Sequence, residues 1–159
     1  MMYRPVPSPI GLLHVTATDD AVVAIWFAGQ EPTGAPADGP HRVLDLATEQ
    51  LEEYFAGART EFDLPLEPRG TPFQQAAWKA LLTIPYGHTV SYGEQARRLG
   101  DPNKARAVGA ANGQNPIPIV VPCHRVIGSS GKLTGFGGGL PTKSWLLEHE
   151  QTVVGHRLF

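Results

Sequence analysis

The stretch "SYGEQARRLGDPNKARAVGAAN" (residues 91–112) decides the fold of the C-terminal part of the chain. Ser91 is a favourable helix N-cap and Glu94, three residues later, would complete a capping box, so a short helix is predicted to about Leu99, before the Gly-Asp-Pro turn at residues 100–102. Residues 103–112 predict a second short helix. Two short helices joined by a tight turn with a glycine have the pattern of a helix-turn-helix motif.

The second of these helices has an unusual composition, because alanine and glycine fill most of its interior. One interpretation is tight packing against a neighbouring helix. The other is a close approach of the helix to a nucleic-acid backbone, with Arg106 as the long cation able to bind phosphate or replace a base in a stack. Both interpretations can hold, on different faces of the helix. The candidate nucleic-acid contacts are Lys104, Ala105, Arg106, Ala107 and Gly109.

The charge of the chain divides at about residue 70. Residues 1–70 carry four Lys/Arg against eleven Asp/Glu (−7), and residues 71–159 carry nine against four (+5). We therefore expect two domains, 1–70 and 71–159, with the basic one facing a polyanion. Thr71, Pro72 and Gln74 predict a capped helix at the start of the second domain.

The first domain is expected to be small and of α/β or α+β class. Residues 10–18 and 21–28 predict a β-hairpin, 29–40 a loop, 42–56 a helix and 61–66 a third strand. No catalytic motif is evident in this domain. The second domain is expected to be mostly helical.

The composition excludes several classes of protein. The 159 residues contain one cysteine, which rules out an internal disulfide framework and a multi-cysteine zinc site. We expect no metal and no cofactor. No apolar run reaches the ~20 residues of a membrane span, and no signal peptide is evident, so a cytoplasmic location is expected.

The lone cysteine, Cys123, lies in "VVPCHRVIG" (residues 120–128). A free cysteine is often a buried small hydrophobe. The neighbours favour a nucleophile, because His124 is a potential base and the charge of Arg125 would favour a thiolate. Prolines at 116, 118 and 122 stiffen the segment that begins after Asn115.

A glycine-rich loop and a final helix follow. The loop contains Phe136, Gly137 and Gly138, and its amides are open to a ligand. The last helix is predicted from Lys143, with Thr142 as its cap, to about residue 150. A carboxylate on it could orient His124, and the residues alone leave Glu148 and Glu150 as alternatives.

These segments together resemble one family. "PCHRV" (122–126) resembles the active-site signature of O6-alkylguanine-DNA alkyltransferases, also called methylated-DNA–protein-cysteine methyltransferases. The likeness covers nearly all of residues 71–150. It extends more loosely to "SPIGLL" (8–13) and "YFAG…FDLPL" (54–66). The resemblance implies a ribonuclease-H-like first domain and a winged helix-turn-helix-like second domain.

The resemblance also implies a function. The protein would bind double-stranded DNA, flip out O6-alkylguanine (and also O4-alkylthymine), and move the alkyl group once and irreversibly to its own Cys123. It would be a stoichiometric methyltransferase that acts in DNA repair. The resemblance further implies a monomer in solution that is able to assemble cooperatively on DNA.

The family positions imply roles for particular residues. His124 would deprotonate Cys123 through a water and Glu150, rather than Glu148, would orient it; Asn115 would brace the turn. Tyr92 would give a proton to the leaving base and contact DNA, with Lys143 in support. Arg106 would fill the gap left by the flipped base. The implied pocket and DNA contacts also include Pro118, Val126, Phe136, Gly137, Gly138 and Arg125.

Departures and alternatives remain. Many members have tyrosine where this chain has Phe136, and some carry a zinc site in the first domain, for which residues 1–70 supply no cysteine.

The alternative functions are a lesion-binding module that transfers nothing, which resembles the alkyltransferase-like proteins, and a cysteine hydrolase. Retention of Cys123 favours transfer.

Overall fold

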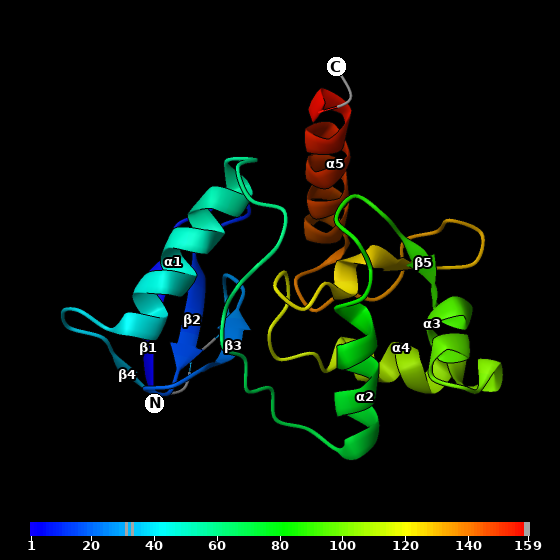
Figure 1. Ribbon diagram of the computed structural model, residues 1–159, viewed down its shortest axis with the longest axis horizontal. Coiled ribbons are helices and arrows are strands. Elements are labelled where there is room, and N and C mark those ends of the chain that lie inside the picture. The colour runs from blue at the N-terminus through cyan, green and yellow to red at the C-terminus, as the bar shows by residue number, and fades with distance from the viewer. Residues whose placement is uncertain (31, 33, 158–159) are drawn as a thin grey trace. The chain divides into compact units, whose positions relative to one another are not determined.

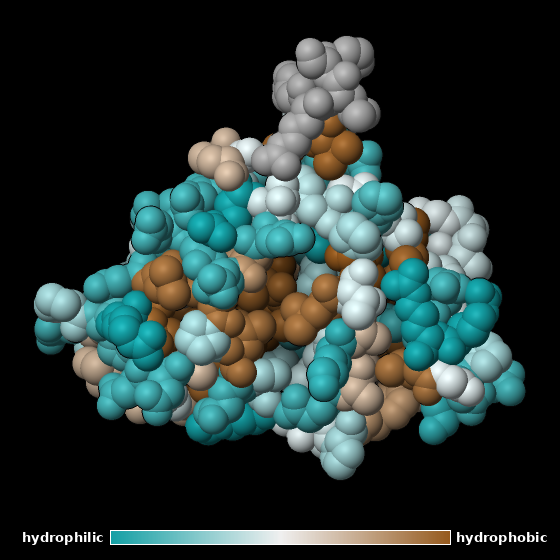
Figure 2. Space-filling view, in the orientation of Figure 1, coloured by the Kyte–Doolittle hydropathy of each residue, from teal (hydrophilic) through white to brown (hydrophobic). Residues whose placement is uncertain are grey.

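The computed structural model describes residues 1–30, 32 and 34–157, with side chains up to residue 155. The chain divides into two compact units, Met1–Arg69 and Gly70–Phe159. Figure 2 shows several apolar areas among hydrophilic side chains on one face. Among the described residues, no helix combines the length and the apolar character that crossing a membrane requires.

The first unit is a four-stranded sheet covered by one helix. Strands β2 and β3 form the predicted antiparallel hairpin and β1 pairs with β2, so that Val6 lies opposite Leu13 and Val15 opposite Ile25. The helix α1 packs on β1, β2 and β3 (Figure 1). The sheet order is β3-β2-β1-β4. The elements are β1 (Met2–Val6), β2 (Leu13–Ala17), β3 (Val22–Trp26), β4 (Ala35–Pro36) and α1 (Arg42–Phe55).

Two of these strands were not predicted from the sequence. Pro5 within β1 argues against a strand, because proline has no amide hydrogen to donate. The backbone of Pro5 faces the same edge of β1 as that of Met1 and Tyr3, whose carbonyls accept hydrogen bonds from the β4 segment. Among the described residues β4 pairs only with Met2 and Tyr3, so that side of β1 has no pairing strand there beyond Tyr3, where a missing donor is tolerated. The short β4 lies inside the predicted loop 29–40, of which Glu31 and Thr33 are outside the described residues.

The strand predicted at residues 61–66 is wrong. Only an isolated bridge joins Leu66 to Val22. The buried side chain of Gln50 on α1 takes the place of a neighbouring strand. Its amide donates to the carbonyl of Asp63 at 3.0 Å and its oxygen accepts from the Asp63 amide at 2.8 Å.

The second unit is mostly helical, with one short parallel strand pair. Helices α2, α3 and α4 pack on one another, and α5 packs on the turn η2 that carries the cysteine. Within the helix-turn-helix segment, buried Gln95 and Asn112 exchange two amide hydrogen bonds at 3.0 and 2.8 Å, which fixes α3 against α4. The elements are α2 (Pro72–Leu81), β5 (Val90–Ser91), α3 (Tyr92–Arg98), η1 (Pro102–Lys104), α4 (Ala105–Gly113), η2 (Cys123–Arg125), β6 (Val126–Ile127) and α5 (Leu140–Arg157).

The helix caps show where local sequence signals succeed. Thr71 and Gln74 form the predicted capping box of α2. Ser91 caps α3, but the Glu94 carboxylate contacts Arg97 and Arg98 instead of completing the box.

The prediction for the last helix is wrong at both ends. α5 begins at Leu140 rather than Lys143, so Thr142 lies inside the first turn and is not the cap. Pro141 next to the start is compatible with this, because the first turn of a helix needs no amide donor there. The helix also continues beyond Glu150 to Arg157.

Candidate active site

The chain approaches Cys123 through two tight turns. The amide of Val120 bonds the carbonyl of Pro118 at 2.9 Å, which closes a γ-turn around Ile119. Ile119 has a φ of +74°, which is rare for a β-branched residue and costs about 1–3 kcal/mol. A second bond, from the Cys123 amide to the Val121 carbonyl at 2.8 Å, closes an inverse γ-turn at Pro122. The backbone before the cysteine is therefore compact and strained.

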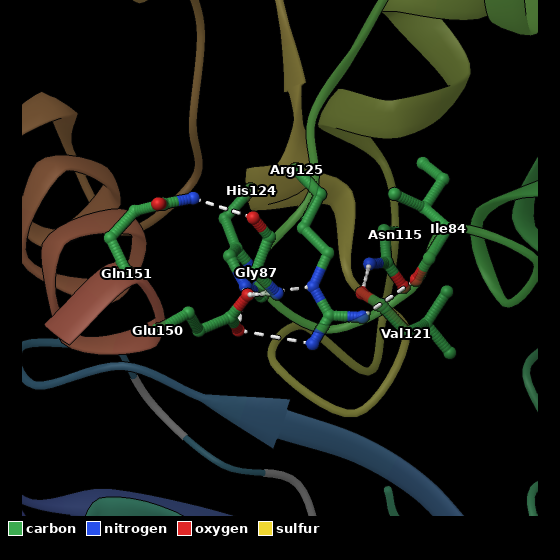
Figure 3. A network of polar contacts seen from close by, with 8 residues as sticks. All are labelled: Ile84, Gly87, Asn115, Val121, His124, Arg125, Glu150 and Gln151. Atoms are coloured by element: carbon green, nitrogen blue, oxygen red, sulfur yellow. Dashed lines mark hydrogen bonds and ion pairs between the residues drawn. The ribbon is translucent and has the colours of Figure 1, made fainter. Parts of the chain in front are cut away.

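Asn115 ties this compact segment together. Its amide nitrogen donates to the carbonyl of Val121 at 2.8 Å (Figure 3). Its oxygen accepts from the Ile117 amide at 3.0 Å. The same side chain also lowers the pKa of the Cys123 thiol, which favours the thiolate. One amide thus braces the turn and acts on the sulfur.

Cys123 opens the 3₁₀ turn η2 and is 8% exposed. Burial raises the pKa of the thiol, against the opposing effects of the Asn115 hydrogen bond and the positive charge of Lys143. The resting group is therefore a thiol, which needs a base before it can act as a nucleophile.

His124 and Glu150 form a fully buried pair. His124 Nε2 lies 2.7 Å from Glu150 Oε2, and the two side chains are 0% and 1% exposed. Neighbouring donors hold the pKa of Glu150 far below its usual range despite burial. Because an ionised carboxylate only accepts hydrogen bonds, His124 Nε2 is the donor. The other ring nitrogen, Nδ1, has no hydrogen-bond partner among the described residues. Burial lowers the pKa of His124, so the ring is neutral and Nδ1 can take a proton.

The prediction that Arg125 contacts DNA is wrong, because its side chain points into the protein. Arg125 is 6% exposed and donates to Glu150 Oε1 through Nε at 2.8 Å and to Oε2 through Nη2 at 3.1 Å. Its Nη1 donates to the carbonyl of Ile84 at 2.8 Å (Figure 3). Its charge is matched by Glu150, so the expectation that it favours the thiolate is not supported either; Lys143 is the cation that acts on the sulfur.

Lys143 lies on α5 and is completely buried. Its Nζ donates to the carbonyls of Val126 and Thr134 at 2.7 and 2.8 Å and lies 5.8 Å from the ring centre of Tyr92. Burial lowers the pKa of Lys143, and the ionised Cys123 would raise it. The hydroxyl of Tyr92 accepts from Thr134 Oγ1 at 3.1 Å.

A pocket of about 630 Å³ lies beside these groups, between the start of α3, the face of α4 and the glycine-rich loop. Arg106 is exposed at this pocket. The pocket contains six residues singled out from the sequence and three that were not. The former are Tyr92, Ala105, Arg106, Gly109, Phe136 and Gly137; the latter are Gly113, Thr134 and Gly135.

Other residues predicted for the pocket or for DNA lie around it. Pro118 and Val126 are buried, and Gly138 is half-buried. Ala107 and Lys104 are exposed, and the Lys104 ammonium lies 5.4 Å from the centre of the Phe73 ring.

Sequence reasoning missed the groups that hold the site through the backbone. The amide of Gly87 donates to Glu150 Oε1 at 3.3 Å, and the carbonyls of Ile84 and Thr134 accept from Arg125 and Lys143. No side-chain pattern marks a carbonyl acceptor. The turn residues that follow α2 and β6 in the sequence predict only that turns lie there, and they do not predict which carbonyls accept a hydrogen bond.

Comparisons with known proteins cover both units. Residues 1–68 match the ribonuclease-like domain of 6-O-methylguanine DNA methyltransferase, and residues 72–152 match the DNA binding domain of the same protein. A methylated-DNA–protein-cysteine methyltransferase of Mycolicibacterium paratuberculosis is 54% identical over 151 residues, which are 94% of this chain and 92% of the relative. One from Methanosarcina acetivorans is 44% identical over 153 residues, which are 94% of this chain and 98% of the relative.

A solved structure agrees. The crystal structure of Mycobacterium tuberculosis OGT in complex with DNA matches with a TM-score of 0.90 and 52% identity, covering 96% of this chain and 94% of that one. The predicted fold class, a small α/β domain followed by a mostly helical one, is confirmed. The chain belongs to the 6-O-methylguanine DNA methyltransferase family.

Proposed function

We propose that this protein repairs double-stranded DNA by moving the alkyl group of O6-alkylguanine, or of O4-alkylthymine, to Sγ of its own Cys123, once and irreversibly. The observation that carries the proposal is the arrangement around the only cysteine. Cys123 adjoins a buried His124–Glu150 pair whose second imidazole nitrogen is unpartnered among the described residues. The relatives named as methylated-DNA–protein-cysteine methyltransferases support it.

The reaction is a displacement at the alkyl carbon. The proton of the Cys123 thiol passes through a water to Nδ1 of His124, and the sulfur forms a bond to carbon as the bond from carbon to O6 breaks. The electron pair of that bond stays on guanine, which takes a proton from the hydroxyl of Tyr92. The proton on His124 then replaces the one that Tyr92 gave up. The products are unmodified guanine and S-alkylcysteine.

The pocket would receive the flipped base. Tyr92, Phe136 and Gly137 line it, so the base would meet an aromatic ring and open backbone groups. Arg106 stands at the same pocket on α4, where it could occupy the space that the base leaves in the duplex. DNA is supported as the partner by the M. tuberculosis structure, which was solved in complex with DNA. A monomer in solution, cooperative assembly on DNA and a cytoplasmic location stay predictions.

The test is a reaction of the protein with a duplex oligonucleotide that contains one O6-methylguanine, with protein in excess. Intact mass and peptide mapping should show the gain of one methylene on Cys123, one per protein, after which the reaction stops. Cys123→Ser should bind the duplex without gaining mass. Binding by the parent protein with no gain of mass would replace this function by that of a lesion-binding module.

A further inference from the structure

Two of the hydrogen bonds to the carboxylate of Glu150 come from one side chain. Arg125 Nε and Arg125 Nη2 reach the two oxygens at 2.8 and 3.1 Å, the Gly87 amide reaches Oε1 at 3.3 Å, and His124 Nε2 lies 2.7 Å from Oε2 (Figure 3). Glu150 is 1% exposed, so the protein replaces nearly all of its hydration. A bidentate guanidinium is the strongest single partner for a carboxylate.

Arg125 is itself fixed from another direction. Nη1 donates to the carbonyl of Ile84 at 2.8 Å, and the guanidinium lies 5.5 Å from the centre of the Tyr86 ring. These contacts come from the segment between α2 and β5, whereas Glu150 lies on α5. The guanidinium therefore joins that segment to the helix that carries the carboxylate, and it has a single position next to His124.

We propose that Arg125 is a positioning residue for the transfer reaction: by matching the charge of Glu150, it keeps His124 neutral, with its hydrogen on Nε2 and its free electron pair on Nδ1. This inference rests on the proposed function for its use of Nδ1 as the base. The statement about the protonation of His124 does not depend on that function.

The reason is the charge balance around the ring. A buried carboxylate without a cation is strongly disfavoured, and the protein would neutralise it by binding a proton. The proton would go to the more basic neighbour, since the ordinary pKa of histidine is 6.5 and that of glutamate is 4.5. His124 would then be an imidazolium paired with Glu150, and Nδ1 could no longer accept the proton of Cys123.

The charged groups that act on His124 come from two segments. Glu150 and Lys143 come from α5 and Arg125 from η2, and the ring of Tyr86 lies against the guanidinium of Arg125. Glu150 raises the pKa of His124, while burial and the charges of Arg125 and Lys143 lower it. Loss of Arg125 removes one of the positive charges that lower the pKa of His124. The opposite effect of Glu150, which raises that pKa, then becomes larger.

The experiment follows His124 directly in the full-length chain. Histidine labelled with ¹⁵N reports by NMR which ring nitrogen carries hydrogen and at what pH the ring becomes charged. In the parent protein we expect the neutral Nε2–H form at pH 7. In Arg125→Met the pKa of His124 should rise, and in Arg125→Lys, which keeps the charge with fewer contacts, it should rise less. Arg97→Met, the same change at an exposed arginine of the same unit, should leave it unchanged.

The thiol gives a second measurement, because Cys123 is the only cysteine. The rate of its alkylation by iodoacetamide should rise with pH along a curve that moves to higher pH in Arg125→Met. At pH 7 the alkylation rate of Arg125→Met should be at least tenfold lower than that of the parent protein. At pH 9 most of this difference should disappear, because a His124 imidazolium with a raised pKa loses its proton only at higher pH. A merely structural role would instead lower the rate at every pH without moving the curve.

Three results would overturn the inference. They are a charged or Nδ1–H ring in the parent protein at pH 7, an unchanged pKa of His124 in Arg125→Met, and, if that variant does not fold, an unchanged pKa in Arg125→Lys. None of these measurements needs DNA. A protein that transfers no alkyl group but shows the expected titrations would refute the proposed function and support only the statement that Arg125 keeps His124 neutral.

Discussion

Replacing Glu150 by glutamine tests how much the buried carboxylate stabilises the second unit. Glutamine has almost the same size, but its NH₂ group would face one of the donors on His124 or Arg125, and Arg125, 6% exposed, would lose its anion. Breaking a buried ion pair from one side costs about 3–5 kcal/mol. With a urea dependence of about 2 kcal/mol per molar, the unfolding midpoint should fall by about 1.5–2.5 M.

Glu148→Gln is the matched control, because Glu148 is exposed on the same helix and should change stability by less than about 0.5 kcal/mol. Unfolding can be followed by the fluorescence of Trp78 and Trp145, which lie in the same unit. The pKa of Glu150 is lowered by folding, so its contribution is complete above about pH 4.5 and is lost as the pH falls below that value. Equal midpoints for the two variants at pH 7, or a difference that does not shrink in acid, would refute this account of the carboxylate.

The other predictions concern DNA, the leaving base and pH. Arg106→Ala should slow transfer from duplex DNA at least tenfold while leaving alkylation of Cys123 by iodoacetamide unchanged; equal losses would remove Arg106 from the DNA interface. Tyr92→Phe should slow single-turnover transfer, since the leaving base loses its proton donor, and an unchanged rate would exclude that role. Stability should fall as the pH drops below about 6.5, because the unfolded chain protonates His124 and burial lowers the pKa of the folded form; urea midpoints that stay level from pH 8 to pH 5 would contradict this.

Local signals in the sequence predicted those elements that local chemistry determines. The Thr71–Gln74 capping box and the Ser91 cap are formed by residues three apart, and the hairpin of β2 and β3 follows from a short turn. The strand predicted at residues 61–66 is wrong because the backbone of Asp63, in the middle of the segment, bonds a side chain from α1, a contact between distant positions. Sequence patterns indicate which secondary structure a segment prefers. They do not indicate which hydrogen-bond partner a distant segment provides.

The same distinction applies to the site. The residues alone predicted Cys123, His124 and an acidic residue of the last helix as the site, but they did not choose between Glu148 and Glu150. The structure makes the difference plain, because Glu148 is exposed and Glu150 is buried against His124. Arg125 was misassigned for a related reason. A cation next to an active-site motif in a basic domain is typical of DNA contacts, and only the fold shows that a carboxylate from another helix lies within its reach.

The two buried cations of the site have different partners, and this difference explains how a raised thiol pKa is compatible with nucleophilic chemistry. The charge of Arg125 is matched by Glu150, whereas the Lys143 ammonium, among the described residues, donates to two carbonyl oxygens and lies near the ring of Tyr92. With His124 neutral and Cys123 as a thiol, these buried side chains carry a net charge of +1, from two cations and one anion. Transfer of the Cys123 proton to His124 leaves this net charge unchanged, because a thiolate and an imidazolium form together, and Lys143 lowers the cost of the thiolate. The thioether formed by alkyl transfer has no ionisable sulfur, so the site that promotes the first transfer cannot form a thiolate for a second.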